Sequence, residues 1–274
     1  MVPAKGDKYD LAEPDLKSFA RSTIRTKVML TLLEGSKTIG ELERRMNTRS
    51  TTILHSIKSL MESRLVEKKQ LGYSLTNIGK IQAILLDELV DTIVTINENQ
   101  DFWLLHDLSG IPLELQKRIG MLGQGEIIKD APETPLKSLD YFIATLSDSK
   151  EIRGVSPVLL TGYPEAIAHV VKNGAFVELI LTKPVLNATI VEQKELLKEL
   201  LDTDNFKLYS IEADLNISFT VTESFLNLGL SRIDGSYDLG ADLVYCVESA
   251  IIWGNMLFDH YRHLSKNVAK CDIN

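Results

Sequence analysis

The chain has 274 residues, of which 44% are hydrophobic and 25% charged, and its formal net charge is −8. This composition is ordinary for a folded globular protein and excludes a disordered or fibrous chain. No apolar run has the length of a membrane span and the first residues lack the apolar stretch of a signal peptide, so we expect a cytoplasmic protein without membrane contact. Two cysteines, Cys246 and Cys271, predict neither a disulfide framework nor a cysteine-rich metal site.

Charge is distributed unevenly along the chain. Residues 1–85 contain 15 lysines and arginines against 9 aspartates and glutamates, whereas the remaining residues contain 15 against 29. An acidic chain would ordinarily argue against a nucleic-acid partner, but here the positive charge is concentrated on one segment, where phosphate would need it.

Apolar spacing between residues 22 and 63 predicts three successive helices. The first ends at Gly35, a residue suited to the position after a helix C-terminus. The second begins at Thr38, because its hydroxyl and Glu41 three residues later form a capping-box pattern. A turn at Asn47-Thr48 leads into the third helix, predicted for residues 49–63, which buries an apolar stripe of Ile53, Ile57, Leu60 and Met61.

The outward side of the third helix is polar and matches what a DNA major groove accepts. Short hydroxyls allow close approach to the duplex, and arginine and histidine can reach base edges or phosphates. We therefore expect DNA contacts from Arg49, Ser50, Thr51, Thr52, His55 and Lys58. Residues 67–76 predict two short strands around Gly72, a wing that presents Lys68 and Lys69 to the backbone. The alternative is a helical module that binds a protein.

Residues 78–96 predict a long connector helix, because apolar residues recur in it at helical spacing without a proline. Its apolar stripe must pack on something, and we favour the same helix of a second copy. A two-fold homodimer would present two recognition helices to half-sites roughly 34 to 36 Å apart on double-stranded DNA.

Beyond residue 139 strands alternate with helices, which predicts an α/β domain around a mixed sheet. We expect helices at 139–146, 164–172, 190–200 and 250–264, and strands at 152–160, 176–181, 206–211, 217–221, 226–230 and 241–247. Cys246 falls in the last strand, where packing in the core is expected. A redox-sensing role would need an exposed thiol of low pKa.

The residues around 22–35 and 73–79 resemble the ArsR/MarR-like winged-helix regulators. Stretches farther along, Phe102-Trp103 to Pro112, Arg118-Ile119-Gly120 and Ile252-Trp253-Gly254 to Arg262, resemble the archaeal methanogenesis regulatory proteins over roughly residues 15–265. That resemblance implies an α+β architecture: a winged helix-turn-helix at 15–77, a connector or dimerisation helix at 78–99 and an α/β regulatory domain at 100–274. It implies a transcription regulator, and we expect no cofactor.

The last part of the regulatory domain resembles half of a phospholipase-D-type fold, whose enzymes use a nucleophilic histidine followed two residues later by a lysine. Ser218 and Thr220 stand in those positions, so we expect no such catalysis and no enzyme. A concavity that has lost catalytic side chains suits a small effector, and we place its site near Tyr163, Ser218 and Thr220.

Metal binding is not expected. The histidines at 106, 169, 260 and 263 are scattered, without carboxylate partners at metal-ligand spacing. The segment from Asp234 to Asp238 has oxygen side chains that a cation could use, but a loop between two strands has the same composition, and we favour the loop. The hypotheses that remain are a ligand- or partner-responsive DNA-binding regulator, a protein-interaction module, and a residual phosphodiesterase-like enzyme.

Overall fold

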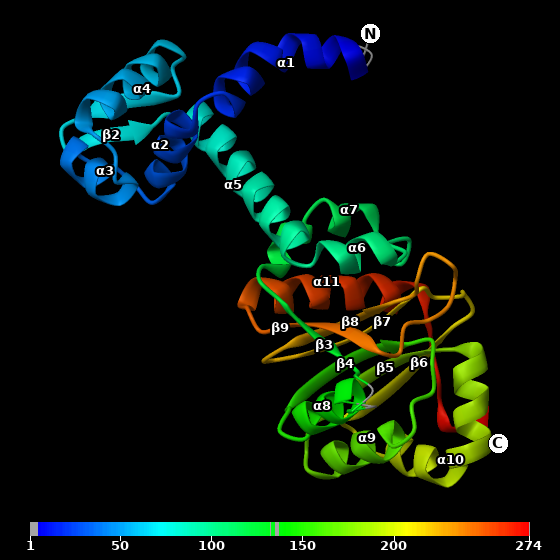
Figure 1. The fold of residues 1–274 in the computed structure, drawn as a ribbon. Helices are drawn as coiled ribbons and strands as arrows, with labels where there is room; N and C mark the ends of the chain where they lie inside the picture. Colours follow the sequence, from blue (N-terminus) through cyan, green and yellow to red (C-terminus); the bar gives the residue numbers. More distant parts are fainter. Residues whose placement is uncertain (1–4, 132, 135–136, 274) are drawn as a thin grey trace. The chain divides into compact units, whose positions relative to one another are not determined.

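The structure is a computed structural model that describes residues 5–131, 133–134 and 137–273. Its contacts divide the chain into two compact units, which meet between Val90 and Asp91 within the long helix α5 (Asn77–Glu98). Figure 1 shows the helices and strands of both units. None of the described helices is long and apolar enough to cross a membrane.

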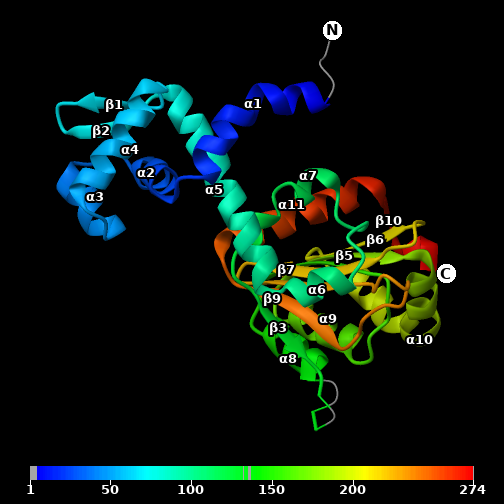
Figure 2. The same ribbon diagram turned by 45° about the horizontal axis from the view of Figure 1, so that its top comes forward.

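The first unit, the described residues up to Val90, is a winged helix-turn-helix preceded by an additional helix. The three predicted helices are α2 (Thr23–Leu33), α3 (Ile39–Met46) and α4 (Ser50–Glu62), and the wing is the antiparallel pair β1 (Val66–Lys69) and β2 (Gly72–Leu75). Figure 2 shows this hairpin beside α4. Helix α1 (Lys5–Ala20) was not predicted from the sequence.

Local signals in the sequence determine where these helices begin and end. The backbone N–H of Thr38 donates to Glu41 at 2.7 Å and that of Glu41 donates to the Thr38 hydroxyl at 3.3 Å, which completes the predicted capping box of α3. Asn47 ends α3 in the left-handed conformation, φ 47°, and thereby turns the chain into α4. The prediction that Met61 is buried is wrong, because it is 39% exposed and Ser56 lies inside instead.

The wing is anchored to the segment before α3. Lys37 and Tyr73 exchange two backbone hydrogen bonds of 3.0 and 2.9 Å, which adds a short third strand to the hairpin. Gly72 has a φ of 131°, and a Cβ there would lie 2.4 Å from the carbonyl oxygen of Lys37. Only glycine fits at this close approach, so the turn of the wing is fixed by packing as well as by its own residues.

Helix α5 joins the two units; each of its ends contacts one unit, whereas apolar side chains in its middle are exposed. At its start the Thr76 hydroxyl accepts a hydrogen bond from the N–H of Gly79, and Ala83 is fully buried in the core of the first unit. Near its end Thr95 is buried and donates to the carbonyl of Gly123 in the second unit. Between these ends the apolar side chains are exposed, namely Ile84, Leu85, Leu89, Val90, Ile93 and Val94.

The second unit, from Asp91 onward, is built on one mixed sheet in the order β10-β6-β5-β4-β7-β8-β9-β3. Strands β4, β5 and β6 are parallel and the other pairs are antiparallel. The strands are β3 (Glu126–Lys129), β4 (Glu151–Ser156), β5 (Phe176–Thr182), β6 (Phe206–Ile211), β7 (Ile217–Thr222), β8 (Leu226–Leu230), β9 (Ala241–Tyr245) and β10 (Lys266–Asn267).

Helices cover both faces of this sheet (Figure 1). One face packs against α6 (Gln100–Leu105), α7 (Leu113–Gln116) and α11 (Glu248–Leu264), and the other against α8 (Lys137–Leu146), α9 (Tyr163–Lys172) and α10 (Lys183–Leu201). The alternation of strand side chains supplies both cores: Ile180 of β5 packs toward α11, whereas its neighbours Leu179 and Leu181 pack toward α9 and α10. Short 3-10 turns lie at Ile119–Leu122 and Lys270–Ile273.

The predicted α/β domain with a mixed sheet is confirmed, with local differences. Helix α10 begins at Lys183 rather than near residue 190, and Gln193 interrupts it with non-helical backbone angles. Strands β3 and β10 lie at the two edges of the sheet and were not predicted. The expectation that Cys246 is buried is wrong: β9 ends at Tyr245, and Cys246 follows it on the surface, where Cys271 is exposed as well.

Candidate nucleic-acid interface and small-molecule pocket

The outward face of α4 carries the side chains expected at the major groove. Arg49, immediately before the helix, is exposed, as are Thr51, Thr52, His55 and Lys58, whereas Ser50 is half-buried. The opposite face supplies Ile53, Ile57 and Leu60 to the core of the first unit. One helix thus has a fully packed side and a free polar side, which is the arrangement that a recognition helix requires.

A carboxylate caps the start of this helix. Arg49 stands at the N-cap position and makes no side-chain capping bond, but the backbone N–H of Ser50 donates to Glu43 Oε1 at 2.6 Å. Glu43 lies on α3, so the cap comes from the neighbouring helix. A negative charge here stabilises the positive end of the α4 dipole. Glu43 was not predicted from the sequence, because no local capping pattern marks it.

The wing presents its two lysines to solvent. Lys68 and Lys69 are both exposed, and Lys69 Nζ lies 3.0 Å from Glu67 Oε1 in an exposed ion pair. Such pairs contribute little to stability, about 0 to 1 kcal/mol, so a phosphate could replace Glu67 as the partner at small cost. Leu71, at the tip of the wing, is 80% exposed.

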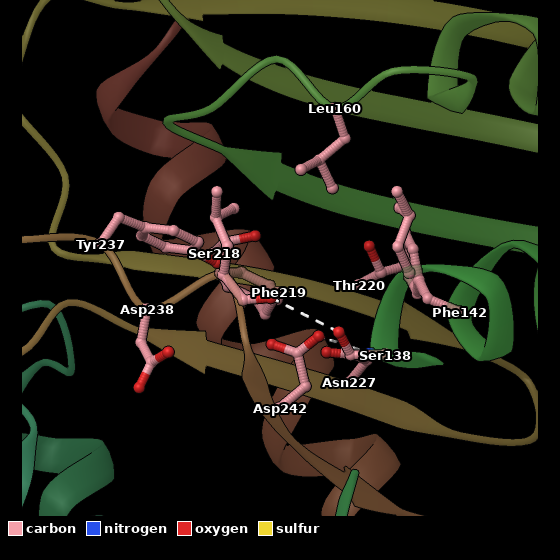
Figure 3. A pocket seen from close by; sticks show the side chains of 12 residues that line it. Ser138, Phe142, Leu160, Ser218, Phe219, Thr220, Asn227, Tyr237, Asp238 and Asp242 are labelled. Atoms are coloured by element: carbon pink, nitrogen blue, oxygen red, sulfur yellow. Dashed lines mark hydrogen bonds between the residues drawn. The ribbon is translucent and has the colours of Figure 1, made fainter. Parts of the chain in front are cut away.

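Ser218 and Thr220 lie on β7 at a small polar pocket of about 40 Å³ (Figure 3). Asn227 of β8 and Asp242 of β9 complete its polar side, together with Tyr237 and Asp238 from the loop between these two strands. Further lining comes from Ser138, Leu139 and Phe142 of α8, and from Leu160, Phe219 and Leu239.

Tyr163 is not among the residues that line the pocket, although it contacts Thr220, which does. Its side chain is almost fully buried, burial raises its pKa to about 12, and its hydroxyl hydrogen-bonds Thr220. The structure therefore brings the three expected residues together, but only Ser218 and Thr220 of them line the cavity. A hydroxyl held this way can orient Thr220 without touching a ligand.

The pocket has an acidic character. Burial, together with the charges of Asp238 and Asp130, raises the pKa of Asp242 to about 6, although a 3.5 Å hydrogen bond from Asn227 acts in the opposite direction. Burial, with Asp242 nearby, also raises the pKa of Tyr237, whose hydroxyl hydrogen-bonds Ser218. No lysine, arginine or histidine lines the pocket among the residues that the structure describes.

Asp238 links the pocket wall to α6. Its Oδ2 lies 2.9 Å from Arg232 Nη2 and 3.2 Å from His106 Nε2. His106 follows the last residue of α6, is buried, and its Nδ1 lies 2.7 Å from the carbonyl oxygen of Phe102, against whose ring it stacks. This pair could not be predicted from local sequence patterns, because His106 and Asp238 are 132 positions apart.

The remaining site expectations fall on ordinary structural elements. Among the described residues no group of histidine, cysteine and carboxylate side chains is placed to hold a metal ion. The segment from Asp234 to Asp238 forms the loop between β8 and β9, in which Asp234 accepts hydrogen bonds from the N–H and hydroxyl of Ser236. His263 is exposed on α11, and its Nδ1 lies close to the carbonyl oxygen of Asp259.

Comparison with known proteins relates both units to one family. Residues 13–94 match the N-terminal domain of the family described as Methanogenesis regulatory protein FilR1, and residues 135–264 match its middle domain. Methanogenesis regulatory protein FilR1 of Methanothrix harundinacea (strain 6Ac) is 33% identical over 274 residues, which cover 97% of this chain and 60% of that protein. The chain therefore spans about three fifths of the length of this relative.

Among solved structures, TrmBL2, an archaeal chromatin protein with a novel mode of DNA binding, is 12% identical with a TM-score of 0.44, covering 97% of this chain and all of that one. The phospholipase D family member Nuc from Salmonella typhimurium is 9% identical with a TM-score of 0.40, over 53% of this chain and 99% of that one. The two domain matches, which together span most of the chain, show that it belongs to the methanogenesis regulatory protein family.

Proposed function

We propose that the protein is a sequence-specific DNA-binding transcription regulator. The observation that carries this proposal is the free polar face of α4, where Arg49, His55 and Lys58 are exposed beside short hydroxyls on a helix that is packed on its other side. Arginine reads guanine and histidine reaches acceptors, while threonines permit close approach to the groove. The exposed lysines of the wing add contacts to phosphate that do not depend on sequence.

The regulator acts as a homodimer through α5. Of the exposed apolar side chains in its middle, Leu85, Leu89 and Ile93 recur at intervals of four residues and form a stripe along one side of the helix. Apolar stripes of this kind pack on a second helix in water, and a two-fold pair doubles the DNA contacts without new residues. The family name and the DNA target together suggest a regulator of gene expression that works in the cytoplasm.

The second unit senses a small effector in the pocket beside Ser218 and Thr220. Its wall residue Asp238 holds His106, which directly follows α6, and α6 follows α5 with one residue between them. We expect this link from Asp238 through α6 to α5 to have two conformations that differ in DNA affinity. An effector can then change DNA affinity only to the extent that it binds one conformation more tightly than the other. A coupling of about 1 to 3 kcal/mol, or roughly 5- to 150-fold in DNA binding, is typical.

Fluorescence anisotropy tests the DNA-binding proposal directly. The purified chain is titrated onto DNA from upstream of its own gene and onto scrambled DNA of equal length, between about 50 and 200 mM salt. We expect tighter binding to the upstream DNA and a steep loss of affinity with salt for both. Equal affinity for the two DNAs, or no binding at the lowest salt, would contradict the proposal.

The exposed stripe of α5 also fits a second proposal, a protein-interaction module without specific DNA binding. That module would show no salt-dependent DNA binding and would bind its partner through α5. A phosphodiesterase-like activity is the third and least supported hypothesis, because Ser218 and Thr220 stand where such enzymes have a nucleophilic histidine and a lysine. Turnover of a generic phosphodiester substrate by the chain would revive it.

A further inference from the structure

The pocket beside β7 offers several oxygen atoms to one small volume. A cavity of about 40 Å³ has room for about three water-sized groups. Figure 3 shows the carboxylate of Asp242 and the side chains of Ser218 and Tyr237 around a common space, with Leu160 and Phe142 at its border. Its lining therefore joins a polar end to apolar side chains, which suits a short ligand with a polar head and a small alkyl part.

Two of these oxygens converge over Gly229 of β8. A Cβ at this position would lie 2.5 Å from the hydroxyl of Tyr237 and 2.7 Å from Asp242 Oδ1. The absence of a side chain at Gly229 thus lets both groups reach the same place. Nearby, Asn227 Nδ2 donates to Asp242 Oδ2 at 3.5 Å, which leaves the amide oxygen of Asn227 free to accept from a ligand.

Asp242 differs from the two other carboxylates of this region in its partners. Asp238 is bound by Arg232 and His106, and Asp130 accepts two hydrogen bonds from Ser138 at 2.9 and 2.8 Å. Among the described residues, the side chain of Asp242 accepts one hydrogen bond, the long one from Asn227. Burial removes water from the carboxylate of Asp242, and the single long hydrogen bond does not replace the hydrogen bonds that water would make. The charged form is therefore disfavoured, which agrees with the rise of its pKa to about 6.

The charge of the pocket discriminates between ligand classes. Carboxylate and phosphate ligands would be repelled by Asp242 and Asp238 and would find no lysine, arginine or histidine among the described lining residues. A neutral polyol would form hydrogen bonds but would leave the charge of Asp242 uncompensated. A divalent metal ion prefers more oxygen ligands of fixed geometry, and the described residues hold no metal-binding cluster. A monovalent organic cation satisfies the charge and the size together.

We infer that the pocket binds the ammonium group of a small amine, with Asp242 as its counter-ion. The three N–H donors of a primary ammonium match Asp242 Oδ1, the amide oxygen of Asn227 and the hydroxyl of Ser218. The alkyl part faces Phe142 and Leu160. This inference rests on the proposed role of the second unit as an effector sensor, for which it supplies the class of effector.

Isothermal titration calorimetry of the full chain without DNA tests the inference. The probes are methylammonium and ethylammonium, with acetamide as the neutral comparison and acetate as the anion. We expect both amines to bind at about pH 8 and neither comparison molecule to bind. Affinity falls about tenfold for each pH unit below the pKa of Asp242, because the protonated acid no longer attracts the cation. The other titratable groups that face this region are Asp238, Asp130, Tyr237, Arg232 and His106.

Asp242→Asn is the decisive variant, because it keeps the shape of the side chain and removes its charge. We expect at least a tenfold loss of amine affinity, whereas Asp214→Asn, an exposed carboxylate in the loop before β7, leaves it unchanged. Circular dichroism verifies that both variants are folded. A second measurement needs no variant: carboxyl ¹³C NMR follows the pKa of Asp242, which methylammonium lowers if it pairs with this group.

Three results would overturn the inference. The Asp242→Asn variant could bind the amines as tightly as the parent, methylammonium could leave the pKa of Asp242 unchanged, or neither amine could produce heat at concentrations up to about 10 mM. Preferential binding of acetate or acetamide would do the same. These results are independent of the DNA titrations: specific DNA binding without amine binding removes only the assignment of the effector. Amine binding by a chain that binds no DNA would contradict the regulator proposal and leave the ammonium site in place.

Discussion

Glu43 of α3 accepts a 2.6 Å hydrogen bond from the backbone N–H of Ser50, the first residue of α4. The contact ties the two helices of the helix-turn-helix together across the turn at Asn47. It also places a negative charge at the end of the helix that we assign to the DNA groove. Stability and DNA affinity therefore make opposite demands on this side chain.

Two substitutions of Glu43 separate these demands. Glu43→Ala removes the cap and should lower the free energy of unfolding of the first unit by about 0.5 to 2 kcal/mol, measured by urea denaturation. Glu43→Gln keeps an oxygen acceptor and removes the charge, so it should bind all DNA sequences a few-fold more tightly in anisotropy titrations. An alanine variant as stable as the parent would show that Glu43 is not the effective cap.

Substitutions on α4 and on the wing should affect DNA binding differently. Arg49→Ala or His55→Ala removes a base-reading side chain and should cost about 1 to 3 kcal/mol on the specific site, with little change on scrambled DNA. Lys68→Ala combined with Lys69→Ala should weaken binding to both DNAs and reduce the salt slope by about one unit for each phosphate contact that is lost.

The control for these variants is Lys117→Ala, which removes an exposed lysine of the second unit that pairs with Glu114. It should change neither affinity nor salt slope. An equal loss on specific and scrambled DNA for Arg49→Ala would contradict the assignment of α4 to the major groove.

Introducing a charge into the exposed stripe of α5 should dissociate the proposed dimer. Leu89, 53% exposed in the single chain, would be buried between two copies, so Leu89→Lys would place a charge in an apolar interface. We expect the mass measured by sedimentation equilibrium to fall to that of one chain. Asp87→Lys is the matched control, because residue 87 lies about 200° around the helix from Leu89 and should leave the dimer intact.

Asp242 should make stability depend on pH in the opposite sense to most carboxylates. Its folded pKa, about 6, lies above its value in an unfolded chain, so its contribution favours folding only at low pH and is lost as pH rises through 6. Asp242→Asn should therefore gain about 3 kcal/mol of unfolding free energy at about pH 8 and little near pH 4, in denaturation measured at both pH values. A gain that is equal at the two pH values would show that charge is not its cause.

Local chemistry accounts for much that could be predicted from the sequence. The capping box of Thr38 and Glu41 and the end of α2 before Gly35 depend on interactions within a few residues, so both could be predicted without contacts from elsewhere in the chain. The edge strands β3 and β10 were missed, because they are short and their status depends on pairing with β9 and β6. The burial of Cys246 was predicted wrongly for a similar reason: where β9 ends depends on the strands that pair with it, and it ends at Tyr245.

The functional features also differ in whether local sequence patterns predict them. The amino-acid sequence was sufficient to predict the winged helix, the polar face with Arg49 and His55, and the apolar stripe of α5, because helical periodicity alone sorts side chains onto faces. The folded structure was needed to show that Glu43 caps α4, that His106 contacts Asp238 and that Asp242 is confined beside Ser218. Those contacts join residues from 7 to 132 positions apart, and burial and charge at such sites exist only once the chain has folded around them.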